Sequence, residues 1–181
     1  GMGLNLMSIG DVYGGNGDLD TSLDYYERSL KIREELGDKS GLGVGLGNIG
    51  LVFHAKGDYE KALGYYDRSL KIKEELGYKR GVGICLSNIG LYYNDIGDYE
   101  KSLDYLEKSL SIQEEIGLKE GYLMLETTTY LYLTYKNLGR EYDKNVIHSL
   151  IKETENIEYY LNYRLYQLLE DPSYLEKIYN Q

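Results

Sequence analysis

Residues 43–82 read GVGLGNIGLVFHAKGDYEKALGYYDRSLKIKEELGYKRGV, and this stretch decides the fold because it recurs along the chain. The next forty residues, 83–122, read GICLSNIGLYYNDIGDYEKSLDYLEKSLSIQEEIGLKEGY and are identical to it at 21 of 40 positions. Residues 3–42 keep the same pattern of glycines and leucines. A fixed period of this size predicts a repeat array, whose function resides on a surface built by stacking and not in a catalytic cluster.

Each repeat is predicted to contain two helices. In the second repeat, Leu46, Ile49 and Phe53 recur at three- and four-residue spacing, which places them on one face of a first helix. Gly57 can adopt the left-handed conformation that ends a helix. Asp58 is suited to cap the free N–H groups at the start of the next helix.

The second helix of this repeat has one apolar side and one charged side. The apolar side is predicted to consist of Tyr59, Leu63, Tyr66, Leu70 and Leu76. The charged side is predicted to consist of Glu60, Lys61, Asp67, Arg68, Lys71, Lys73 and Glu74. Gly77 is expected to end the helix, and residues 77–81 to form a linker. Since one helix pair cannot bury its apolar stripe alone, neighbouring pairs must stack, which predicts an all-α fold, an α-α superhelix.

The residue pattern of this repeat resembles the tetratricopeptide repeat. The resemblance rests on Leu46, Ile49, Gly50, Phe53, Gly57, Ala62 and Tyr66. The usual repeat is about 34 residues long, and the extra length is predicted to lie in the second helix and the 77–81 linker. Glu34, Glu74 and Glu114 replace the proline that often ends the second helix.

The forty-residue form resembles the repeats of kinesin light chains and of spindle adaptors related to Pins. It also resembles arrays fused to bacterial histidine kinases, nucleotide cyclases and ATPase-type regulators. The resemblance covers residues 3 to about 140. It implies a helix–turn–helix solenoid that binds other proteins, and it does not name a partner.

The chain is expected to divide into a repeat array at 3–140 and a helical extension or cap at 141–181. The repeats are expected at about 3–42, 43–82 and 83–122, with a degenerate fourth from 123. The first repeat should place its helices near 3–15 and 19–36. Leu4, Met7 and Ile9 open the first helix with no preceding cap, which leaves its apolar side uncovered. That edge is compatible with a piece of a longer protein.

Two more helices are predicted after the fourth repeat. The first is placed near residues 157–170, because leucines recur at helical spacing there. Pro172 is suited to the first turn of a last short helix. That last helix is predicted to dock through Tyr174, Leu175, Ile178 and Tyr179.

In a stack of helix pairs the first helices line the concave face. Asn48 and Asn88 occupy equivalent places on it, with Ser8 and Thr128 in register. In the arrays that this chain resembles, asparagines at this place clamp the backbone of an extended peptide. An amide both donates and accepts, so it can satisfy a peptide's N–H and C=O. The same amides could instead bond to neighbouring helices, and both interpretations stay open.

The predicted peptide-binding groove is apolar at its centre and polar along one side. It lacks the Lys and Arg residues that would hold a terminal carboxylate, so an extended or helical segment with apolar anchors is the better fit. Gly47 belongs either to a shallow groove floor or to a close approach between helices. The groove is predicted to consist of Ser8, Asp11, Val44, Asn48, Leu51, His54, Ile84, Asn88, Leu91, Asn94, Asp95, Thr128, Leu131 and Tyr135.

The composition excludes several classes of partner. The chain has 30 acidic and 20 basic residues in 181, a net charge of −10. Nucleic acids and anionic membranes need clustered Lys and Arg, so neither is expected to bind, whereas a basic or neutral peptide is compatible. The aromatic residues are 22 Tyr and one Phe, which suits half-buried rings in thin helical layers. The single cysteine, Cys85, and the lack of a long apolar run favour a cytoplasmic protein.

No catalytic or metal-binding pattern is present in the sequence. His54 and His148 are far apart, and no Cys or His has metal-ligand spacing. Cys85 lies between Ile84 and Leu86, which predicts a packing role, and no phosphate-binding GxxxxGK motif occurs. The sequence therefore predicts neither an enzyme nor a cofactor.

Three hypotheses for function follow from these patterns and from the resemblance, which alone suggests the second. The first is a protein-interaction scaffold that binds a peptide segment of a partner in the concave groove. The second is a regulatory module of a larger signalling protein. The third is self-assembly into a homo-oligomer through the terminal repeats, whose end faces can stack.

Overall fold

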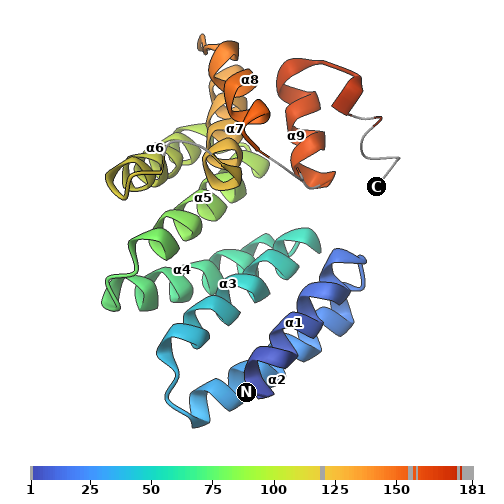
Figure 1. Cartoon of the computed structure of the whole chain (residues 1–181), viewed down its shortest axis with the longest axis vertical. Coiled ribbons are helices and arrows are strands. Elements are labelled where there is room, and N and C mark those ends of the chain that lie inside the picture. The colour runs from blue at the N-terminus through green and yellow to red at the C-terminus, as the bar shows by residue number, and fades with distance from the viewer. Residues whose placement is uncertain (1, 119–120, 155–156, 158, 175, 177–181) are drawn as a thin grey trace. The chain divides into compact units, whose positions relative to one another are not determined.

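The computed structural model describes residues 2–118, 121–154, 157, 159–174 and 176. All regular structure in these residues is helical, as predicted, and α1 packs against α2, α3 against α4 and α6 against α7 (Figure 1). The chain divides into two compact units, residues 1–88 (unit 1) and 89–181 (unit 2). The helices are α1 (Met2–Gly15), α2 (Leu19–Glu35), α3 (Lys39–Ala55), α4 (Tyr59–Glu75), α5 (Lys79–Asp95), α6 (Tyr99–Glu115), α7 (Tyr122–Asn137), α8 (Lys144–Lys152) and α9 (Tyr159–Leu169).

Aspartate caps fix where most of the helices begin. Asp58 accepts a hydrogen bond from the Lys61 N–H at 3.3 Å, and Asp18, Asp38 and Asp98 cap their helices in the same way. Gly57 precedes its cap with a φ of 75°, in the left-handed region that favours glycine. The stop and start signals predicted at residues 57–58 are therefore confirmed, and they recur with the forty-residue period.

Glycine allows the two helices of a repeat to approach closely. A Cβ atom on Gly50 would lie 2.6 Å from the ring of Tyr66, which is fully buried. The Ser69 hydroxyl donates to the Gly43 carbonyl at 2.6 Å and joins the same two helices. Gly47 is also buried, with its Cβ position 3.3 Å from Ser69 Oγ. These contacts support the interpretation of the α3 glycines as sites of helix contact.

The linker predicted at residues 77–81 is much shorter than expected. Helix α4 ends at Glu75 and α5 already begins at Lys79. Residues 79–81 therefore form the first turn of the next first helix, and α3, α4 and α5 each have 17 residues. The extra length of the repeat is shared between its first and second helices.

Two residues of α4 lie on the opposite side from the one predicted. Lys73, predicted on the charged side, is only 6 % exposed, and its Nζ donates to Cys85 Sγ at 3.2 Å. Leu76, predicted on the apolar side, is 44 % exposed. The buried stripe of α4 instead follows Ala62, Tyr66, Ser69 and Lys73. A long lysine stem can pack among apolar groups while its ammonium finds a polar partner.

Unit 2 is organised around α7. Helix α7 packs against α6, α8 and α9, and its side chains are buried on most sides. The helix predicted near 157–170 is α9, which lies beside α7 in Figure 1. Tyr174 is buried as predicted, whereas Leu175, Ile178 and Tyr179 lie outside the described residues.

None of the helices in the described part of the chain is long and apolar enough to cross a membrane.

Candidate functional site

The groove residues predicted in unit 1 lie on α1, α3 and the start of α5, and most reach the surface. Ser8, Asp11, Val44 and Leu51 are exposed. Asn48, His54 and Ile84 are half-buried, and Asn88 is buried. Val44 and Leu51 are seven residues apart and lie on the same face of α3, so this helix presents two exposed apolar side chains on either side of Asn48.

Asn48 is connected to the neighbouring repeat. Its Nδ2 donates to Asp11 Oδ1 at 3.2 Å, and the Tyr26 hydroxyl donates to the same oxygen at 2.7 Å. Asp11 lies on α1 and Asn48 on α3, so the bond between them joins successive first helices, and Tyr26 adds a bond from α2. The structure therefore confirms the interpretation of Asn48 as a tie between helices, and its action as a peptide clamp stays a prediction.

The hydroxyl of Tyr26 is protected from ionisation. Burial raises the pKa of Tyr26 above its ordinary value, and the hydrogen bond to the Asp11 carboxylate raises that pKa further. A tyrosinate at this place would be desolvated beside a second negative charge. The donor that orients the Asp11 carboxylate thus stays protonated throughout the neutral range.

Unit 1 is expected to lose stability as the pH rises above about 10, the ordinary pKa of tyrosine. Because the pKa of Tyr26 is raised in the fold, the folded state keeps a proton that the unfolded state releases. The stabilisation is complete below that pH and declines above it, by at most about 1.4 kcal/mol per pH unit for one tyrosine. Urea titrations from about pH 8 to about pH 11 should give a shallower decline for Tyr26→Phe than for the wild type. Equal declines would contradict the assignment.

His54 is held by aromatic side chains. Its Nδ1 lies 3.4 Å from the Tyr66 hydroxyl, and its ring meets the edges of Tyr59 and Tyr66. These contacts attach the imidazole to α4, the second helix of the same repeat. His54, predicted as a groove residue, is therefore a half-buried packing residue.

Several groove residues predicted in unit 2 are already engaged within that unit. Asn94 is buried, and its Nδ2 donates to Thr134 Oγ1 at 2.8 Å. Thr128 and Leu131 are also buried, at 4 % and 3 % exposure. Tyr135 is half-buried, and its hydroxyl donates to Glu107 at 3.3 Å. Leu91 packs against the apolar core of the unit.

Helix α9 pairs directly with a predicted groove residue. The Arg164 guanidinium donates from one nitrogen to both oxygens of Asp95, at 2.8 and 2.7 Å. Leu161 and Leu165 of α9 are fully buried in the same apolar cluster as Leu131. The leucine spacing of α9 could be recognised in the sequence, whereas the role of Arg164 was missed. The signal was that Arg164 is the one charged residue of this helix.

Additional bonds fasten α9 to α7. Lys136 Nζ donates to the Gln167 carbonyl at 2.7 Å and pairs with Glu170 at 2.7 Å. The first-helix face of unit 2 that corresponds to the groove is therefore occupied by the protein's own helix. In unit 1 most of the corresponding side chains reach the surface, whereas Asn88 is buried.

The described residues contain no group of three or more His, Cys, Asp and Glu residues that could hold a metal ion. Cys85 is a free, buried thiol whose Sγ lies 3.2 Å from Ser69 Oγ. Its position within the packing of α4 and α5 agrees with the structural role predicted for it.

A family model described as tetratricopeptide repeat matches residues 3–75 and 43–115. None of the curated proteins compared with the chain matches it. Among solved structures, BtubC (BKLC) from P. vanneervenii is 22 % identical with a TM-score of 0.66, and the match covers 81 % of this chain and 59 % of BtubC. The apo form of RapI is 19 % identical with a TM-score of 0.70, over 98 % of this chain and 60 % of RapI.

The putative kinesin light chain of Podosopora anserina, described as having nearly identical TPR-like repeats, is 15 % identical with a TM-score of 0.68. That match covers 97 % of this chain and 92 % of the other. At these identities the likeness concerns the fold alone. The chain spans about three fifths of the length of BtubC and of RapI.

Proposed function

Because the chain belongs to the tetratricopeptide repeat family, we propose that it is a protein-interaction scaffold that binds a peptide segment of a partner protein along the first helices of unit 1. The observation that carries this proposal is Asn48, a surface amide fixed in orientation by Asp11 and flanked by exposed apolar side chains. A cytoplasmic location is part of the proposal and is supported by the free thiol of Cys85.

The Asn48 amide is suited to hold a peptide backbone. Its Nδ2 donates to Asp11, and no donor among the described residues reaches its Oδ1. The carbonyl oxygen can therefore accept a backbone N–H of a peptide, while the Nδ2 group is already engaged by Asp11 and by the Tyr26 hydroxyl. Because Asp11 fixes the rotamer beforehand, little side-chain freedom is lost when a peptide binds.

The residues around Asn48 indicate which kind of peptide segment this groove would bind. Val44 and Leu51 offer apolar contacts on α3, and Ile84 adds one from α5. The charged residue of this groove is Asp11, and the whole chain carries a net charge of −10. We expect a neutral or basic segment with apolar anchor residues, not an acidic one.

Asn48→Ala is expected to weaken the binding of groove ligands at least about tenfold, since a buried peptide group would lose its hydrogen-bond partner. The test selects peptides from a display library on the wild-type chain and measures their affinities by calorimetry. Asn137→Ala is the matched control, because Asn137 is an exposed asparagine at the end of α7, outside this groove.

The circular dichroism of both variants should match that of the wild type. If selected peptides bind Asn48→Ala as tightly as the wild type, Asn48 is only a structural tie and the proposed clamp is wrong. If no peptide is selected by a correctly folded wild-type chain, the groove of unit 1 does not bind peptides.

A further inference from the structure

Helix α1 keeps an apolar stripe that α3 buries. The forty-residue period sets Leu6, Ile9 and Val12 of α1 in the places of Leu46, Ile49 and Val52 of α3. In α3 all three are at most 5 % exposed. In α1, by contrast, Ile9 is 38 % exposed and Val12 is 62 % exposed. The two helices have similar surface chemistry and differ in what covers them.

The cover of the α3 stripe is α2. Ile49 and Val52 belong to an apolar cluster with four residues of α2, at positions i, i+4, i+7 and i+11. One of them, Leu30, lies so close to Gly45 that a Cβ there would be 2.8 Å from Leu30 Cδ2. The four residues of α2 are Leu19, Leu23, Tyr26 and Leu30.

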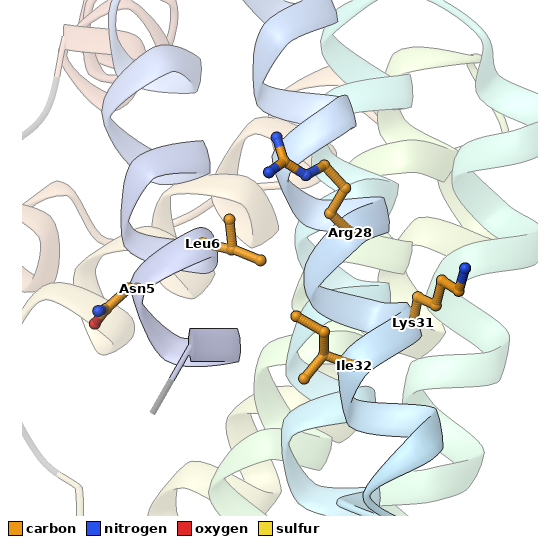
Figure 2. A pocket seen from close by; sticks show the side chains of 5 residues that line it. All are labelled: Asn5, Leu6, Arg28, Lys31 and Ile32. Atoms are coloured by element: carbon orange, nitrogen blue, oxygen red, sulfur yellow. The ribbon is translucent and has the colours of Figure 1, made fainter.

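Leu30 of α2 packs against α3 beside Gly45. A depression formed by α1 and α2 lies at the equivalent place one repeat earlier. Figure 2 shows this depression, which has a volume of about 350 Å³. Two of its residues, Asn5 and Leu6, are one period before Gly45 and Leu46. It is lined by Asn5, Leu6, Arg28, Lys31 and Ile32. The mostly apolar lining and the exposed cationic ends of Arg28 and Lys31 suit an apolar side chain that has acidic neighbours.

We propose that the outer face of α1, defined by Leu6, Ile9, Val12 and this depression, binds an amphipathic helix of a partner protein. The partner helix carries apolar residues at i, i+4, i+7 and i+11, as α2 does. It would pack on α1 in the way that α2 packs on α3. A second copy of the chain is a poorer occupant, because its α2 and α6 already pack against α3 and α7. On α1 this surface adjoins the groove that contains Asn48, but it shares no residue with that groove.

The probe is a synthetic peptide with the sequence of residues 18–37, DLDTSLDYYERSLKIREELG. An isolated helix of this length is marginal in water, so weak binding is expected and NMR is the suitable method. Addition of the peptide to the isotope-labelled full chain should shift the amide signals of residues 6–13 in a saturable manner. Val12→Asp should weaken this binding at least about tenfold, because it buries a carboxylate in the apolar stripe.

Two controls keep the experiment decisive. Leu36→Asp changes an apolar residue that is 76 % exposed and lies outside the stripe, so it should bind the peptide as the wild type does. A peptide in which Leu23 and Leu30 are replaced by serine should not shift the α1 signals. The proposal is overturned if both peptides act alike or if saturable shifts exclude residues 6–13. If the signals of residues 6–13 shift with protein concentration in the absence of peptide, a second copy of the chain is the occupant, and the proposal is also overturned.

Discussion

Gly50→Ala is expected to destabilise unit 1 by about 2 kcal/mol, although alanine is the better helix former by about 1 kcal/mol. The new methyl group would lie 2.6 Å from both Cδ1 and Cε1 of Tyr66. Tyr66 is fully buried, so its ring cannot turn into solvent to relieve the overlap. Overpacking of a tight interior costs about 1 to 3 kcal/mol, and the distance here places the cost at the upper end.

Gly64→Ala provides the matched comparison within the same repeat. Gly64 lies in α4, and a Cβ there would meet no atom within 4 Å. This variant should therefore gain stability, by up to about 1 kcal/mol. Urea unfolding followed by circular dichroism measures both changes. Equal or greater stability of Gly50→Ala than of the wild type would show that α3 and α4 can separate without cost.

Asp95→Ala is expected to destabilise unit 2 by about 3 kcal/mol and to release α9 from α7. The side chains of Asp95 and Arg164 are 14 % and 22 % exposed, so the pair is largely shielded from water. Removal of one partner from a buried ion pair typically costs about 3 to 5 kcal/mol, because the other charge stays desolvated. The partial exposure of this pair places the cost at the lower end.

Hydrogen exchange read by mass spectrometry locates the effect. Amides of residues 159–169 should exchange faster in Asp95→Ala, while amides of unit 1 should keep their protection. The control is Asp104→Ala, which removes an exposed pair with Lys108 on α6 and should leave the exchange of α9 unchanged. Unchanged protection of α9 in Asp95→Ala would mean that the leucines of α9 hold it without the ion pair.

Much of the fold could be predicted because each repeat contains its own local signals. The forty-residue period fixes which residues are equivalent, and the Gly57–Asp58 pair marks a turn by backbone conformation and capping alone. The tight glycine positions could also be recognised, since Gly10, Gly50 and Gly90 recur in register. These features depend on neighbours in sequence, and the structure agrees with them.

The features that were missed depend on partners distant in sequence or on side-chain length. Arg164 and Asp95 are 69 positions apart, and the leucine spacing of α9 indicates an amphipathic helix but not the surface that it covers. Lys73 appeared to be a surface residue because lysine usually is one, yet the stacking of α5 on α4 buries its stem. The candidate groove could be predicted from the order of the helices. That α9 engages the equivalent positions of unit 2, which leaves the candidate groove to unit 1, could be learned only from the position of α9.

Second helices that look alike in sequence are joined to the helix that follows each of them by unlike chemistry. At one equivalent position near the end of three successive second helices, Arg33 pairs with Asp38, Lys73 bonds to the Cys85 thiol, and Gln113 donates to Thr127. A gene rearrangement that removed residues 83–122 would set Lys73 opposite Leu125, the counterpart of Cys85, and leave a buried ammonium group without its sulfur acceptor. The repeats are therefore not interchangeable, because each is matched to the neighbour that it adjoins.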